Sequence, residues 1–505
     1  MAAKKGWTPA RIKMYIGYAV MFLCYIAVAL FAPHHELVEG SAQYDAWTLI
    51  PPLAIFAFIL LTKKILEGFF WSSLLVVFIK YRWDFMKGFV DDMFTQVTTW
   101  DNWWVIYLFL LAGTITILFK YSGAGTYFAR WIAKKIKNEK VAMFVTSFVL
   151  WPLCLDDYMS ALVTGSVFSP LLDSYKVPRE MTAYIIRSTA APIATLLPIG
   201  AWAIYVGAVL DMWKLDILEG TSGFSYYFAN ILPFLFLPIT AILVSWLVIL
   251  GVIPKFGKMK RAFTRVAEGG PVGPAKEPRY DDDGNLIEEE VETAPEPRKR
   301  VNLSHFLVPI VAIVFFGYIF EWDMAYGITW GMLVTFVYYC ITGVFNTDDA
   351  HDVVCDGFAY MSEMCIMMGF GLILCNGLDS IGFVNFVVSN VEGFVAASTL
   401  PIIIFIVFSA TEMLVTFNYT LYLIAMPIVV ALAEASGANV PLTIAALVSS
   451  GVFGYLLAFS SDGGMLTCAS CGNIDIYEQN TTQYPYMIIA WVLAAIAYLA
   501  AGFIL

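Results

Sequence analysis

The sequence predicts an all-α polytopic membrane protein built from two inverted-topology repeats, with broken or re-entrant helices at the membrane midplane and one extra N-terminal span. Three observations lead to this prediction. The 505-residue chain is 60% hydrophobic and only 14% charged, with a mean hydropathy of +0.74; soluble chains are about 45–50% apolar. Apolar runs long enough to cross a bilayer recur along the chain. Polar clusters with prolines and glycines interrupt some of these runs at corresponding places in each half.

Composition also excludes several classes of protein. The net charge of −11 says little about partners, because much of it lies in loops; no nucleic-acid partner is expected. The eight cysteines are scattered, mostly in apolar segments, and suggest no disulfide framework. The Cys468-Ala-Ser-Cys471 motif has no second cysteine pair, so a zinc or redox role is not favoured. No cofactor is predicted.

Residues 1–46 are predicted to form a cytoplasmic N-terminus and the extra span, at 13–32. Basic residues precede this span, which places the N-terminus in the cytoplasm; they are Lys4, Lys5, Arg11 and Lys13. No small-residue cleavage site follows the apolar run, so we interpret it as a retained span and not a signal peptide. We expect a multi-pass protein of a prokaryotic plasma (inner) membrane.

The first membrane repeat is predicted over 47–253. Its expected elements are spans at 47–62, 66–80 and 103–120, an interfacial amphipathic helix at 83–100, a surface or re-entrant helix at 122–138, broken elements at 141–174 and 178–212, and a clean span at 227–253. Residues 254–301 hold ten basic and ten acidic residues together with prolines and glycines. This composition predicts a disordered cytoplasmic linker.

The second repeat, over 302–505, follows the same order of elements. It has predicted spans at 303–321 and 325–345, an amphipathic stretch at 349–362, a span at 363–378, a glycine-containing piece at 380–396, broken elements at 400–435 and 440–478, and a last span at 484–504. Corresponding positions lie about 260 residues apart, and Asp156-Asp-Tyr158 falls against Phe417-Asn-Tyr419. The first repeat would enter the membrane from outside and the second from the cytoplasm, which predicts inverted halves. Chance similarity is the alternative.

The most informative stretch is 144–206, where polar clusters lie inside long apolar runs. Asp156 and Asp157 are adjacent there, and each carboxylate costs roughly 2.5–3.5 kcal/mol at the centre of a membrane helix. Helix breaks at this depth persist where the freed backbone lines a cavity or a site. We therefore expect an ion or substrate site; a loop outside the bilayer with solvated aspartates is the alternative.

The same stretch resembles the Na+/H+ antiporter family of the NhaC type. In the first half the resemblance lies in Leu155-Asp-Asp-Tyr158, Thr164-Gly-Ser166, Lys176-Val-Pro-Arg-Glu180, Ala183-Tyr-Ile-Ile-Arg-Ser-Thr-Ala-Ala-Pro192 and Leu197-Pro-Ile199 followed by Trp202. In the second half, Ser461-Asp462, Cys471-Gly-Asn-Ile-Asp475 and Thr482-Gln-Tyr-Pro-Tyr486 are similar to part of that family's pattern. The resemblance implies Na+/H+ exchange, although relatives also move amino acids or small carboxylic acids.

Two departures from the family pattern affect the expected site. Arg187 stands where the family usually has an acidic residue, and Gly463-Gly464 follow Ser-Asp where Thr-Thr is usual. Arg187 could pair with an aspartate of the site as an internal counter-ion. Alternatively its planar fork could bind the carboxylate of an organic substrate.

Oxygen-bearing side chains and unwound backbone carbonyls are suitable ligands for Na+. The predicted ion- or substrate-binding residues are Asp156, Asp157, Thr164, Arg187, Ser188, Thr189, Asn418, Ser461 and Asp462, with Asp156, Asp157 and Asp462 as the Na+ ligands. A proton and a cation would compete for these carboxylates, which would couple the two fluxes. For each Ser and Thr, local bonding to broken backbone is an equal alternative. Glu412 is a secondary candidate.

The sequence thus predicts a secondary active transporter, with Na+/H+ antiport first and Na+- or H+-coupled transport of an amino acid or small carboxylic acid as the alternative. Its expected partners are the bilayer, Na+ and H+, with an organic acid and a homodimer left open. An enzyme is not expected, because the chain lacks the Gly-x-Gly-Asp motif of intramembrane aspartyl proteases. A channel would not need two matched, inverted sites.

Overall fold

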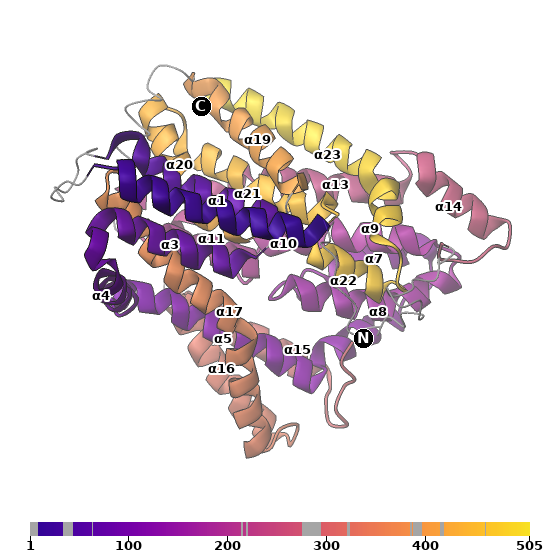
Figure 1. The fold of residues 1–505 in the computed structure, drawn as a ribbon. Helices are drawn as coiled ribbons and strands as arrows, with labels where there is room; N and C mark the ends of the chain where they lie inside the picture. Colours follow the sequence, from indigo (N-terminus) through magenta and orange to yellow (C-terminus); the bar gives the residue numbers. More distant parts are fainter. Residues whose placement is uncertain are drawn as a thin grey trace, which may run out of the picture.

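The computed structural model describes residues 9–33, 44–62, 64–213, 216–218, 221–274, 294–320, 324–383, 386, 396–414, 419–459 and 461–505. Within these residues the fold is all-helical, without strands (Figure 1). Five helices are long and apolar enough to cross a membrane, and up to eight spans result if each bent helix pair counts as one. The predicted all-α polytopic fold is confirmed. The inverted relation between the halves remains a prediction.

The N-terminal part begins with α1 (Pro9–Phe31), α2 (Ile50–Thr62), α3 (Ile65–Tyr81) and α4 (Phe85–Val97). The predicted amphipathic helix is α4. It exposes Met86 and Phe94, while its Asp92 is buried and lies 3.1 Å from the Lys80 ammonium of α3. Lys87 and Asp91 are exposed beside these apolar side chains, and such an amphipathic surface is suited to a helix lying in the membrane interface.

The chain then continues through α5 (Trp100–Ser122), α6 (Ala124–Ala133), α7 (Glu139–Val149), α8 (Asp157–Ser174), α9 (Arg179–Arg187), α10 (Ala190–Leu196) and α11 (Ala201–Met212). The predicted broken elements at 141–174 and 178–212 are interrupted between α7 and α8 and between α10 and α11. A further bend, which was not predicted as a break, lies between α5 and α6. The axes of α5 and α6 differ by 58° at Gly123, whose φ of +67° favours glycine. The α9–α10 segment and α11 differ by 41° across Leu197-Pro-Ile-Gly200.

The predicted clean span at 227–253 is wrong in one respect. The structure has α12 (Gly223–Tyr226), a π turn, a short 3-10 turn and then α13 (Phe236–Leu250), with a bend of 53°. Pro233 lies within the 3-10 turn and Pro238 in the first turn of α13. Since neither proline can donate a backbone hydrogen bond, the regular helix is interrupted between them.

The predicted disordered linker is also partly wrong. Residues Gly257–Ala267 form α14, which buries Met259, Ala262 and Val266. Two ion pairs attach α14 to the bundle: Arg265 lies 2.9 Å from the buried Glu180 of α9, and Lys258 lies 2.7 Å from Glu478. Amphipathic spacing and long-range pairing therefore order this part of the linker. Residues 275–293 lie outside the described residues.

The second half comprises α15 (Leu303–Ile319), α16 (Met324–Ile341), α17 (Thr347–Ser380), α19 (Leu400–Leu414), α20 (Tyr419–Ser436), α21 (Val440–Leu457), α22 (Asp462–Ser470) and α23 (Ile476–Ile504). The amphipathic stretch and the span predicted at 349–378 form one continuous 34-residue helix, α17, which starts at an Asn346 capping box. The acidic residues in the first turns of α17 are compatible with one continuous helix, because negative charges stabilise a helix N-terminus. The piece predicted at 380–396 lies largely outside the described residues.

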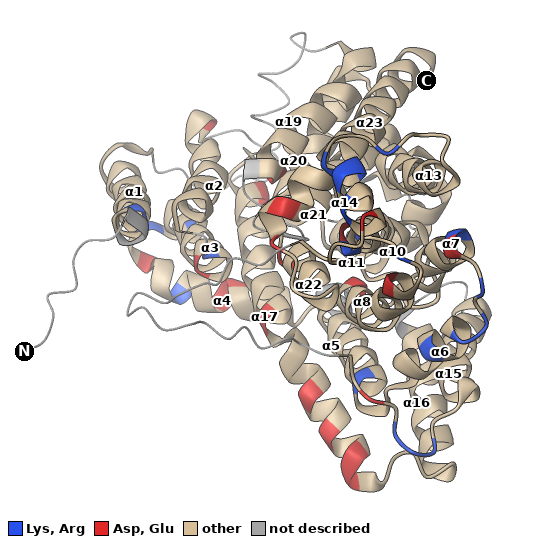
Figure 2. Ribbon diagram, turned by 90° about the vertical axis from the view of Figure 1, so that its right-hand side faces the viewer, with Lys and Arg blue, Asp and Glu red and all other residues tan. Residues whose placement is uncertain are grey.

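Helices from the two halves are interleaved and do not form separate lobes. The α17 helix packs on α5 and α3, α22 packs on α8, and α23 packs on α13, as the neighbouring colours in Figure 1 show. Charged residues take up little of the ribbon, and basic positions are visible at α14, α7 and α6 (Figure 2). This arrangement brings the helix breaks of the two halves together.

Candidate ion-binding site

The first break lies immediately before α8, and Asp156 caps that helix. Its Oδ1 accepts hydrogen bonds from the backbone N–H groups of Tyr158 and Met159, at 2.8 and 3.1 Å. Its Oδ2 accepts a 3.2 Å hydrogen bond from the Tyr360 hydroxyl of α17. Asp156 thus satisfies two donors at the start of the helix, which is the usual role of an aspartate at this position.

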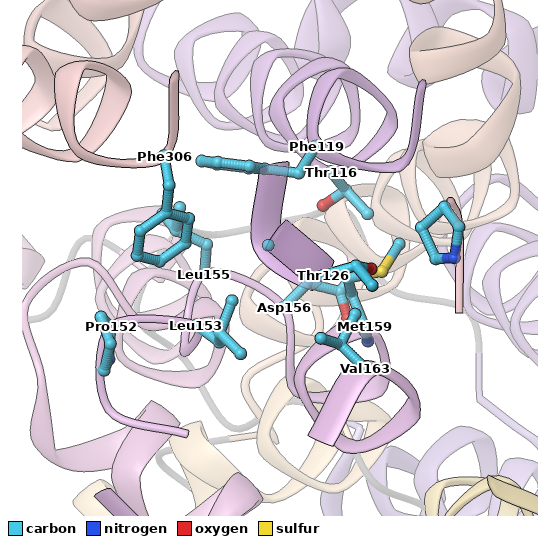
Figure 3. A pocket seen from close by; sticks show the side chains of 12 residues that line it. Thr116, Phe119, Thr126, Pro152, Leu153, Leu155, Asp156, Met159, Val163 and Phe306 are labelled. Carbon is cyan, nitrogen blue, oxygen red and sulfur yellow. Dashed lines mark hydrogen bonds between the residues drawn. The ribbon is translucent and has the colours of Figure 1, made fainter. Parts of the chain in front are cut away.

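Asp156 also lines a small cavity, shown in Figure 3. The cavity measures about 20 Å³, which is room for about one water-sized species. Its polar lining comes from Asp156, Thr116 and Thr126, and the Thr126 hydroxyl is buried without a hydrogen-bond partner. The rest of the lining is mainly apolar, including Met159 and Phe306.

Asp157, the first residue of α8, differs from its neighbour. Its side chain is 1% exposed, and its Oδ2 has no hydrogen-bond partner. Its surroundings include Trp202 of α11 and Tyr455 of α21, whose ring centroids are 6.0 Å apart. Among the described residues no basic side chain forms an ion pair with either aspartate. Asp157 is therefore a buried carboxylate with one oxygen available.

The second break lies before α22, where Ser461 is the capping residue. Its Oγ accepts a 3.1 Å hydrogen bond from the Gly464 N–H and donates one of 3.0 Å to the Tyr455 carbonyl. The next residue, Asp462, is exposed, and its Oδ2 accepts a 2.7 Å hydrogen bond from the Tyr158 hydroxyl. This bond joins the N-terminus of α8 to the N-terminus of α22.

Arg187 is the last residue of α9, and its side chain is completely buried. Nη2 donates to the Tyr455 carbonyl at 2.9 Å, Nη1 donates to Oδ1 of Asn480, and Nε has no partner. No ion pair joins Arg187 to a described carboxylate. The geometry therefore places neutral oxygens, and not the aspartates, next to this cation.

Sequence reasoning missed the amides of α23 that surround this break. Asn480 Nδ2 donates to the Leu457 carbonyl at 2.9 Å, and Gln483 Nε2 donates to the Leu456 carbonyl at 2.6 Å. These carbonyls belong to the last turn of α21, where a helix has no further N–H groups to donate to them. The run Gln479-Asn-Thr-Thr-Gln483 inside an apolar stretch was the signal that could have revealed them.

The remaining predicted residues divide into three groups. Thr164 is buried and its hydroxyl has no partner. Ser188 donates to the Tyr184 carbonyl at 2.7 Å, which is the local bonding expected of a serine in broken backbone; Thr189 pairs with the Ser147 hydroxyl at 3.0 Å. Asn418 lies outside the described residues. Within the part of the chain that the structure describes, no group of three or more His, Cys, Asp or Glu side chains is arranged to hold a metal ion.

Comparison with solved structures gives the fold. The YdaH transporter of Alcanivorax borkumensis is 12% identical with a TM-score of 0.60, and the match covers 98% of each chain. MtrF of Neisseria gonorrhoeae, a member of a class of antimetabolite efflux pumps, is 10% identical with a TM-score of 0.58 over 96% of this chain and 94% of its own. Both likenesses concern the fold alone.

Comparison of sequences gives the family. An uncharacterised protein of Haemophilus influenzae is 26% identical over 178 residues, which is 34% of each chain, so the match spans about a third of that relative. The profile of the Na+/H+ antiporter family matches residues 215–503, more than half of the chain. The protein belongs to the Na+/H+ antiporter family.

Proposed function

We propose that the protein exchanges Na+ for H+ across a prokaryotic plasma membrane by alternating access. The observation that carries this proposal is the buried Asp157 carboxylate, whose Oδ2 has no hydrogen-bond partner and which has no basic partner among the described residues. Burying a bare charge is costly, so such a group is neutralised by a proton or by a cation. One group that holds either species in turn couples their movements.

Neighbouring groups support this role for Asp157. Asp156 lies beside it, fixed by its capping bonds, and lines a cavity that could admit a water or a partly dehydrated ion. Asp462, hydrogen-bonded to Tyr158, is exposed and is suited to attract cations toward the site. The N-termini of α8 and α22 lie beside these acids, and the positive end of each helix dipole stabilises the ionised carboxylates that would receive a cation.

A second candidate function is coupled transport of an amino acid or small carboxylic acid. Arg187 Nε is buried without a partner and could donate to a substrate carboxylate. MtrF, which shares the fold, is a member of a class of antimetabolite efflux pumps. Against this candidate, Arg187 is completely buried and both of its Nη atoms already donate to the protein.

Purified protein in liposomes would test both functions. An imposed Na+ gradient should drive proton movement in the opposite direction, and the flux should saturate and reverse with the gradient. A panel of amino acids and carboxylic acids should give no Na+-dependent uptake. Uptake of one of these acids without Na+-dependent proton flux would overturn Na+/H+ antiport and favour the second candidate.

A further inference from the structure

We propose that the Arg187 guanidinium is a resident cation that fills a monovalent-cation site at the α21–α22 break, and that emptying position 187 would open this site to Na+. The inference rests on the proposed function only in taking Na+ as the relevant ion. It adds a second site, permanently occupied by the protein itself, to the exchangeable site at Asp157.

The ligands of the guanidinium are the first argument. Its Nη atoms contact a backbone carbonyl, that of Tyr455, and an amide oxygen, Oδ1 of Asn480. The Ser461 hydroxyl bonds the same carbonyl at 3.0 Å and lies in the same break. Carbonyl, amide and hydroxyl oxygens at the end of an unwound half-helix are the ligand types that bind Na+ in transporters.

Electrostatics give the second argument. No ion pair links Arg187 to a carboxylate among the described residues, yet the charge is fully buried. The guanidinium contacts the Tyr455 carbonyl in the last turn of α21, which ends at Leu457. A helix C-terminus carries a partial negative charge, which favours a cation at this place.

Space is the third argument. A Cβ on Gly464 would lie 2.6 Å from Arg187 Nη2, too close for a side chain while the guanidinium keeps this position. The guanidinium therefore fills the room between the end of α21 and the start of α22. Arg187 thus contacts Gly464, the second residue of the glycine pair.

The test uses full-length purified protein with Asp157→Asn, which removes the exchangeable carboxylate. Melting temperatures are compared in NaCl and in choline chloride at equal ionic strength. The quantity compared is the melting temperature in NaCl minus that in choline chloride. Adding Arg187→Ala or Arg187→Ser should increase this difference by about 2 °C or more over that of the parent, because Na+ then binds the folded state. Binding of radioactive Na+ should appear in the same variants.

Two matched controls keep the pocket filled. Asp157→Asn with Arg187→Lys retains a cation, and Asp157→Asn with Arg179→Ala removes an arginine from the opposite end of α9; neither should respond to Na+ more than the parent. An equal response of parent and emptied variants would overturn the proposal. The proposal would also be overturned if the variants with Arg187→Ala or Arg187→Ser failed to fold both in NaCl and in choline chloride, because Na+ should take the place of the guanidinium. Because Na+ binding and melting temperature are measured without any transport, this result is independent of whether the wild type is an antiporter.

Discussion

The breaks before α8 and before α22 are built alike but are occupied differently. Each places a capping side chain, Asp156 or Ser461, directly before an aspartate at the first position of a half-helix. At the first break that aspartate, Asp157, is buried with an available oxygen. At the second, Asp462 is exposed, and the buried polar space is filled by Arg187 and Asn480.

This difference assigns different tasks to the two halves. A buried carboxylate without an ion-pair partner among the described residues can exchange a proton for a cation. At the second break, the Tyr455, Leu457 and Leu456 carbonyls already accept hydrogen bonds from arginine and amide side chains. We expect ion exchange at the first break and structural support at the second.

Asp157→Asn should have the largest effect on transport. It preserves the shape of the side chain but removes the charge and the ability to hold a proton, so coupled flux should fall to that of empty liposomes. Asp173→Asn, at the far end of the same helix and paired with Arg179, is the control and should transport. Near-normal flux in Asp157→Asn protein would move the exchange site elsewhere.

Asn480→Leu tests the support at the second break. It removes the acceptor for Arg187 and the donor for the Leu457 carbonyl, so we expect stability to fall by about 3 kcal/mol or more. Thermal unfolding in detergent measures the loss. Asn230→Leu, whose amide makes only an exposed 3.4 Å bond within its own turn, is the control. Equal melting temperatures for the two variants would contradict a supporting role for Asn480.

Asp462→Asn should have a smaller effect than Asp157→Asn. Its side chain is exposed and accepts hydrogen bonds from the Tyr158 hydroxyl and the Gly463 N–H, so we expect flux slowed by about tenfold or less. The slowing should shrink at high salt, because an exposed carboxylate attracts cations through a screened field. Complete loss of exchange in this variant would make the two breaks equivalent.

Ser188→Ala should have the smallest effect. The Ser188 hydroxyl donates only to carbonyls of its own helix, Tyr184 and Ile185, so no ion ligand is lost. Flux and melting temperature should match the wild type, with a stability change of about 0.5 kcal/mol or less. A marked rise in the Na+ concentration needed for half-maximal flux would instead assign Ser188 to the site.

Local patterns in the sequence were enough to predict the all-helical fold and the break before α8. Asp156 and Asp157 could be found because paired acids in an apolar run are unusual. The roles of Tyr455 and Asn480 could not, since their contacts with Arg187 depend on how α9, α21 and α23 pack, across 268 and 293 residues of chain. The order of α14 was missed for the same reason: its Arg265 pairs with Glu180, 85 residues away.

Proton release on Na+ binding tests the central claim, that Asp157 holds either a proton or Na+, most directly. Na+ is added to wild-type protein in a weakly buffered detergent solution with a pH indicator, with choline as the reference. The wild type should release about one proton per chain at pH values where the free site is protonated, and Asp157→Asn protein should release none. Equal release from both proteins, or Na+ binding by the wild type without proton release at any pH, would contradict the claim.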